Sequence, residues 1–135
     1  MIALDTNVLA RFFVDDPDDP EAARQRPAAM AALGERGFVP VTVLLEFEWV
    51  LRGFYKSPRA EILRAFRALA GFNHVSLEDR TQFLAALDAY ATGLDFADAL
   101  HVARSSRAAS FRTFDRRLAK SAARAGLATP VQALG

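Results

Sequence analysis

The sequence contains no cysteine, which excludes disulfide bonds and thiolate metal sites. No apolar run approaches the ~20 residues that a helix needs to span a bilayer. The first residues lack the basic segment that opens a secretory signal, and lysine occurs only at positions 56 and 120. From these absences we expect a cytoplasmic protein. The length of 135 residues and the apolar content of 52% suit one domain, residues 1–135.

Charge is unevenly distributed along the chain, although the net charge is only +1. Residues 1–100 hold 10 Lys and Arg against 15 Asp and Glu, whereas residues 101–135 hold 7 against 1. A metal-dependent nuclease needs acids to bind the metal and cations to bind phosphates. A charged helix face exposed to solvent gives the same composition, and on charge alone we favour that simpler interpretation.

Short apolar strands alternate with helical periodicity, which predicts a small α/β domain. Asp19, Thr42 and Ser57 are expected to cap the helices that follow them. Strands are expected at residues 2–4, 38–41, 72–75 and 108–114, with a final strand or tail at 130–134. Helices are expected at about residues 8–14, 22–36, 43–51, 58–70, 78–90, 96–103 and 116–124.

The first strand runs directly into Asp5, Thr6 and Asn7, after which the apolar spacing becomes helical. This places Asp5 at the C-terminal edge of a strand, where open α/β sheets bind their ligands. A carboxylate at that edge needs a cation, a hydrogen-bond donor or water, because a buried unpaired charge is costly.

Two acids, Glu46 and Glu48, interrupt the nearly all-apolar helix expected at residues 43–51. Glu46 is expected on the strand-end side of the sheet, near Asp5. Glu48 lies ~200° round the helix from Glu46, so the two cannot point the same way. A purely structural alternative pairs Glu46 with Arg52 or Arg11; we rank a metal-binding or catalytic role above it.

Three acids in the second half of the chain complete the pattern. Asp95 and Asp98 have the spacing of an N-cap and its third helical residue, so we assign Asp95 to capping. Asp98 then lies in the first helical turn, where the helix dipole stabilises its charge. Asp115 directly follows the fourth strand. His101 is expected to be a packed or partly exposed residue, because magnesium prefers oxygen ligands.

Four acids that converge in a small α/β domain would repel one another and raise their pKa values unless divalent cations neutralise them. Oxygen ligands without histidine or cysteine select Mg²⁺ or Mn²⁺. Such a site deprotonates a water and stabilises the phosphate during attack on a phosphodiester. The expected catalytic and metal-binding acids are Asp5, Glu46, Asp98 and Asp115. Side chains placed to hydrogen-bond these carboxylates or a metal-bound water are Thr6, Asn7 and Thr113.

Four motifs in this order resemble the PIN-domain family, and within it the VapC-type toxins of bacterial toxin–antitoxin pairs. They are Asp5-Thr6-Asn7, Leu45-Glu46, Asp95-Phe96-Ala97-Asp98-Ala99-Leu100 and Thr113-Phe114-Asp115. The resemblance implies a three-layer α/β/α sandwich with a mostly parallel sheet of about five strands. It also implies a homodimer, Mg²⁺-dependent endoribonuclease activity, and a small antitoxin whose C-terminal segment covers the acidic groove. The family's acidic quartet falls on the four acids named above.

Two other classes of protein remain open as alternatives. One is a metal-dependent phosphoryl-transfer domain of the receiver or haloacid-dehalogenase type. The receiver type needs a lysine after a late strand, and neither lysine of this chain follows a strand end. The haloacid-dehalogenase type needs a second acid two residues after the first, where this chain has Asn7. The other is a catalytically silent PIN scaffold that only binds RNA or protein. In the nuclease interpretation, we expect Arg116 and Arg117 to contribute to RNA binding.

Overall fold

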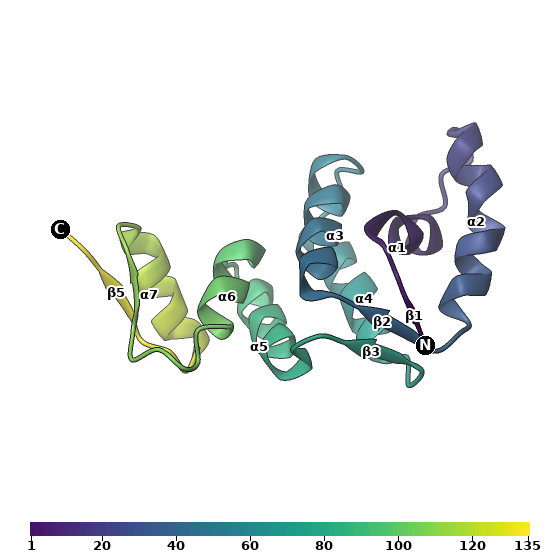
Figure 1. Cartoon of the computed structure of the whole chain (residues 1–135). Helices are drawn as coiled ribbons and strands as arrows, with labels where there is room; N and C mark the ends of the chain where they lie inside the picture. Colours follow the sequence, from purple (N-terminus) through teal and green to yellow (C-terminus); the bar gives the residue numbers. More distant parts are fainter. The chain divides into compact units, whose positions relative to one another are not determined.

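The computed structural model describes all residues, Met1–Gly135, and they form two compact units, residues 1–78 and 79–135 (Figure 1). The first unit contains β1 (Ile2–Ala3), α1 (Thr6–Phe13), α2 (Pro20–Leu33), β2 (Gly37–Val39), α3 (Val41–Gly53), α4 (Arg59–Ala70) and β3 (Val75–Leu77). The second contains α5 (Arg80–Ala91), α6 (Phe96–Ala103), β4 (Phe111–Thr113), α7 (Arg116–Ala125) and β5 (Val131–Ala133).

The sheet of the first unit has the strand order β1-β2-β3, and both pairings are parallel. Ile2 lies opposite Gly37, and Phe38 lies opposite Ser76. Parallel neighbours need long crossover connections, and the two helices between each pair of strands provide them. A Cβ atom at Gly37 would lie only 3.0 Å from Leu4 Cδ1, which is closer than an ordinary van der Waals contact. Glycine therefore lets β2 lie close to Leu4, the residue that follows β1.

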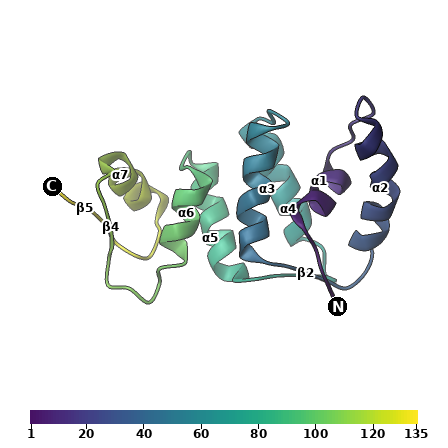
Figure 2. The same cartoon turned by 45° about the horizontal axis from the view of Figure 1, so that its top comes forward.

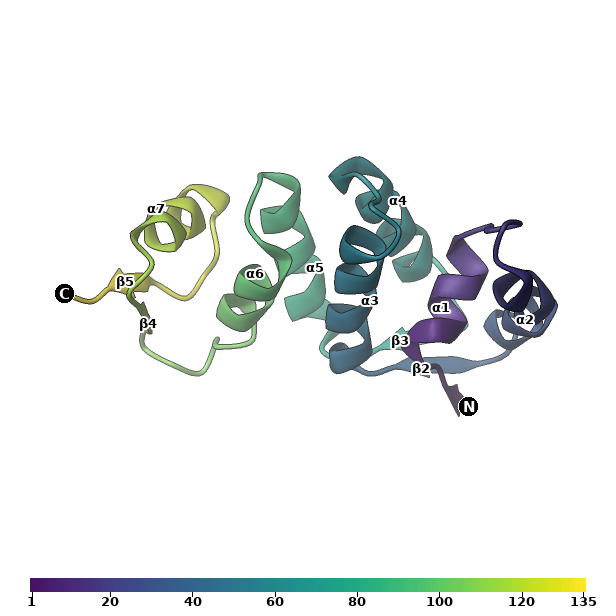
Figure 3. The same cartoon turned by 90° about the horizontal axis from the view of Figure 1, so that it is seen from above.

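Helix packing in the first unit centres on α1, which lies between α2 and α3 (Figures 1 and 3). The phenyl ring of Phe47 on α3 is fully buried and meets Phe66 of α4 edge to face at 5.7 Å. Phe13 of α1 packs against the same Phe47 ring. This aromatic core holds α1 and α3 together and so positions the residues at their N-terminal ends.

The second unit pairs β4 with β5 in parallel, with Phe111 opposite Val131. Helix α7 packs on these two strands, and α5 and α6 lie side by side (Figure 2). The buried ring of Phe96 at the start of α6 contacts Phe83 and Tyr90 of α5 edge to face, with centroids 6.1 and 5.6 Å apart. These contacts anchor the N-terminal turn of α6, which carries Asp98.

Helix caps confirm part of the sequence prediction. Asp19 caps α2 by accepting hydrogen bonds from the amides of Glu21 and Ala22, and Asp95 caps α6. The prediction was wrong for Thr42 and Ser57, because α3 and α4 begin after Pro40 and Pro58, and neither proline gives a side-chain cap.

The cap of α3 comes instead from a distant residue. The Glu78 carboxylate accepts a hydrogen bond from the backbone amide of Val41, 2.8 Å away, and so satisfies a free donor of the first turn. The third strand was also placed too early, since it begins at Val75 and ends at Leu77. Residues 72–74 instead make the turn that leads into it.

The α/β class with parallel strands, expected from the alternation of elements, is confirmed. The strands form a three-stranded and a two-stranded sheet. No helix is both long enough and apolar enough to span a membrane.

Candidate functional site

The strand-end motif of the first unit forms a hydrogen-bonded link to α3. Asp5 caps α1, and its Oδ1 accepts a hydrogen bond from the Thr6 amide at 2.7 Å. Thr6 is only 3% exposed, and its hydroxyl donates a hydrogen bond to Oε1 of Glu46. Two of the predicted acids, Asp5 and Glu46, are thus joined through Thr6. Both carboxylates belong to exposed residues, so they are open to a ligand from solvent.

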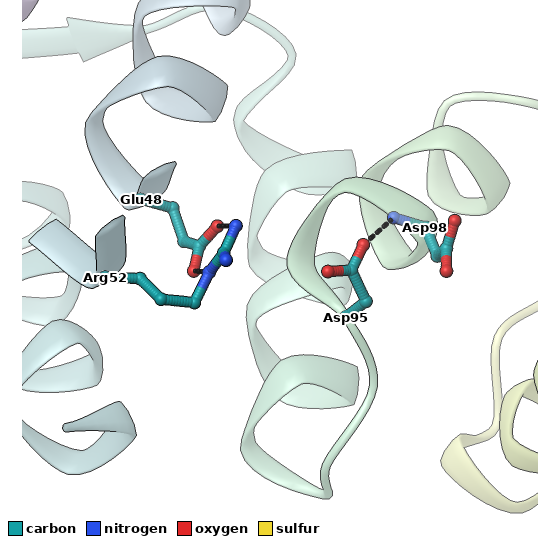
Figure 4. Close-up of polar contacts among 4 residues, drawn as sticks. All are labelled: Glu48, Arg52, Asp95 and Asp98. Atoms are coloured by element: carbon teal, nitrogen blue, oxygen red, sulfur yellow. Dashed lines mark hydrogen bonds and ion pairs between the residues drawn. The ribbon is translucent and has the colours of Figure 1, made fainter. Parts of the chain in front are cut away.

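Glu46 and Glu48 have opposite environments, as the helical geometry predicted. Glu48 is 2% exposed, and its carboxylate is paired with Arg52, whose Nε lies 2.8 Å from Oε2 (Figure 4). The other arginine considered for Glu46, Arg11, donates to the Tyr55 hydroxyl at 2.8 Å. The two arginines of the structural alternative therefore contact other groups, and Glu46 contacts Thr6.

Predicted acids of the second unit line one pocket of about 330 Å³. Asp98 is half-buried there, and its backbone amide donates to Oδ2 of Asp95 at 3.0 Å (Figure 4). Asp95 is therefore the N-cap that the spacing predicted, and it also lines the pocket. The complete lining is Gly93, Leu94, Asp95, Asp98, Asp115, Arg117, Leu118 and Ser121.

The surroundings of Asp98 disfavour its charged form. Partial burial raises the pKa of the Asp98 carboxyl above its usual value, and the negative charges of Asp95 and Asp115 raise this pKa further. His101 lowers the same pKa by a smaller amount. A cation bound in the pocket would relieve this repulsion, so the charge balance fits a metal ion.

Asp115 lies at the beginning of α7 and makes two local hydrogen bonds. Its Oδ1 accepts a hydrogen bond from the Leu118 amide at 3.0 Å, which makes Asp115 the N-cap of the helix. The hydroxyl of Thr113 accepts a hydrogen bond from the Asp115 amide at 3.0 Å. Thr113 therefore fixes the backbone that carries the acid.

Asn7 lies in different surroundings from the acids. It lines a pocket of about 270 Å³ between α1 and α2, together with Val8, Arg11 and Gln25. The rest of the lining is alanine: Ala28, Ala29 and Ala32.

The structure brings the predicted acids together as pairs, Asp5 with Glu46 in the first unit and Asp98 with Asp115 in the second. Within neither unit does a group of three or more His, Cys, Asp or Glu side chains stand close enough to hold a metal ion. Every donor in the two pairs is a carboxylate oxygen, which fits Mg²⁺ or Mn²⁺ better than zinc.

Sequence reasoning named Arg117 for RNA binding without placing it in the acidic pocket, and it missed the polar lining residue Ser121. Both come from α7, at positions i and i+4, and so lie on one face of the helix. The i,i+4 spacing in the sequence already indicated that these two side chains share one face of α7. The sequence does not show that this face borders the acids.

Fold and site define an α/β protein in which β1 and β4 are each followed, two residues later, by an aspartate that caps the next helix. The family model described as PIN domain matches residues 2–124, so the chain belongs to the PIN domain family. PIN domains form a superfamily of nucleases that often act as toxins and typically use divalent metals. Neither the curated proteins nor the solved structures compared with the chain gave a match.

Proposed function

We propose that this chain is an Mg²⁺-dependent endoribonuclease toxin of a VapBC-type toxin–antitoxin pair, and that residues 1–135 act as one PIN domain. The observation that carries the proposal is the PIN family match over residues 2–124, within which all four predicted acids fall. The substrate is RNA in the cytoplasm, cut at internal phosphodiester bonds.

The catalytic acids of the proposed enzyme are Asp5, Glu46, Asp98 and Asp115. Mg²⁺, or Mn²⁺ in its place, would activate the attacking water and offset charge on the phosphate when bound by these carboxylates. Asp5 and Asp115 each use Oδ1 to cap a helix, which restricts their rotamers and leaves Oδ2 for a ligand. The Thr6 hydroxyl orients Glu46 in the same way.

The proposed partners are RNA, a second copy of this chain in a homodimer, and a small antitoxin. The antitoxin's C-terminal segment would cover the acids and so block access of RNA. Arg116 and Arg117 lie in the first turn of α7, adjacent to Asp115, and would hold RNA phosphates there. The frequent role of PIN domains as toxins supports these assignments.

The decisive experiment measures cleavage of RNA by the purified chain in Mg²⁺ and in EDTA, with Asp5→Asn as the matched variant. Asparagine also caps helices well, so this variant keeps the fold and loses one metal ligand. The proposal requires cleavage in Mg²⁺ only, and none by Asp5→Asn. Binding of RNA without cleavage in Mg²⁺ or Mn²⁺ would instead identify the silent scaffold.

A further inference from the structure

Helix α7 carries four basic residues, and one of them, Arg117, lines the acidic pocket. Arg116, Lys120 and Arg124 follow one another at intervals of four residues and form one exposed row. Arg117 lies about 100° round the helix from Arg116, and one turn further along the same face comes Ser121. Arg117 and Ser121 line the acidic pocket together, whereas Arg116, Lys120 and Arg124 do not line it.

The two neighbouring arginines consequently have different contacts. The Arg116 guanidinium donates from Nη2 to the backbone carbonyl of Gly135 at 3.0 Å. Arg117 is exposed and borders the cavity of about 330 Å³ that contains Asp95, Asp98 and Asp115. One cationic side chain therefore lies in a pocket otherwise charged by carboxylates.

A pocket that is charged only by acids repels the RNA backbone that a nuclease must admit. A guanidinium offers a planar set of donors that matches two phosphate oxygens, and a serine hydroxyl offers one further donor. We propose that Arg117 and Ser121 bind an RNA phosphate at the α7 wall of this pocket and so position the strand against Asp98 and Asp115. The inference rests on the proposed function.

The test compares two variants with the same change of charge on the same helix. Arg117→Gln removes the guanidinium in the pocket, and Arg124→Gln removes one in the last turn of α7, which does not line the pocket. Binding of a single-stranded RNA oligonucleotide is measured in EDTA at several salt concentrations. Cleavage of the same RNA in Mg²⁺ then gives kcat and KM.

We expect Arg117→Gln to weaken RNA binding about tenfold or more, because a charged hydrogen bond is lost. The plot of log affinity against log salt concentration should become less steep by about 0.7, the value for one phosphate contact on a single strand. The increase in KM should exceed the decrease in kcat. Arg117→Lys should recover the salt slope with part of the affinity, and Ser121→Ala should show a smaller loss of affinity. Arg124→Gln should match the wild type.

Equal losses of RNA affinity in Arg117→Gln and Arg124→Gln would overturn the inference, because they would indicate general attraction of RNA by a basic helix. A change in melting temperature without a change in affinity would overturn it also, because Arg117 would then only stabilise the acids. Wild-type protein that binds RNA without cutting it refutes the proposed function alone. The affinities and salt slopes still decide the role of Arg117 in that case.

Discussion

The hydroxyl of Thr6 donates a hydrogen bond to the carboxylate of Glu46, 40 residues further along the chain. This bond joins the residue after Asp5 to the middle of α3. The same two helices are also in contact through the rings of Phe13 and Phe47. Because Thr6 is 3% exposed, its hydroxyl has little access to water and relies on this acceptor. The bond therefore fixes the direction of a carboxylate that belongs to an exposed residue.

Replacing Thr6 tests this link. Thr6→Val keeps the shape of the side chain but leaves Glu46 without its donor, so we expect a loss of about 1 kcal/mol in stability. We also expect about a tenfold decrease in kcat/KM for RNA cleavage, because the loss of an orienting hydrogen bond typically costs this much. Thr6→Ser retains the hydroxyl and should keep both properties close to the wild type. Wild-type activity in Thr6→Val would show that Glu46 needs no orientation.

The periodicity of the sequence was sufficient to predict several local features. A strand followed by an acid placed Asp5 just after the first strand and Asp115 at the beginning of α7, although α1 begins at Thr6 and not after Asn7. The three-residue spacing identified the cap at Asp95, and 100° per residue separated Glu46 from Glu48. These features depend on residues close together in the chain, so the sequence alone contains them.

Features that depend on distant residues were not predictable in this way. The cap of α3 is the Glu78 carboxylate, which is 37 residues from the amide that it satisfies. The i,i+4 spacing of Glu48 and Arg52 was available in the sequence, but only the fold shows that Glu48 is the buried acid of the two. The pocket role of Arg117 likewise depends on how α7 packs against its own unit.

The N-cap of α6 provides a second prediction. Asp95→Ala removes the acceptor for the Asp98 amide, so we expect about 1 kcal/mol of destabilisation. The same change removes one of the negative charges that raise the pKa of Asp98, so this pKa should fall. Compared with the wild type, Asp95→Ala should therefore show a larger effect on melting temperature than on specific activity. The reverse ranking would assign Asp95 to the catalytic acids; Asp95→Asn, which retains a cap, serves as the control.

The ion pair between buried Glu48 and exposed Arg52 is expected to affect stability and not catalysis. Arg52→Ala leaves the buried Glu48 carboxylate without its cation; because the Arg52 side chain is 52% exposed and water screens the pair, we expect a cost of about 1–2 kcal/mol. Adding Glu48→Gln to Arg52→Ala should recover part of that loss, because no unpaired charge then remains buried. Chemical denaturation measures both variants. A change in the Mg²⁺ concentration needed for half-maximal cleavage would contradict the assignment of Glu48 to the core.

The raised pKa of Asp98 makes the stability of the protein depend on pH in a defined direction. Because the folded state disfavours the charged carboxylate, it retains the proton at pH values where the unfolded chain has lost it. Ionisation of Asp98 therefore reduces stability as the pH rises above 3.8, the usual value for this group. Asp98→Asn cannot ionise, so it should melt at a higher temperature than the wild type at neutral pH.

The same comparison in Mg²⁺ separates charge repulsion from metal binding. The advantage of Asp98→Asn should disappear as the pH is lowered below 3.8, because the wild-type carboxyl is then neutral in both states. At neutral pH, Mg²⁺ should raise the melting temperature of the wild type, since a ligand that binds only the folded state stabilises it. Asp98→Asn should gain less from Mg²⁺, because one carboxylate ligand is missing. Equal gains for both proteins would remove Asp98 from the proposed metal ligands, even if the pH dependence is as expected.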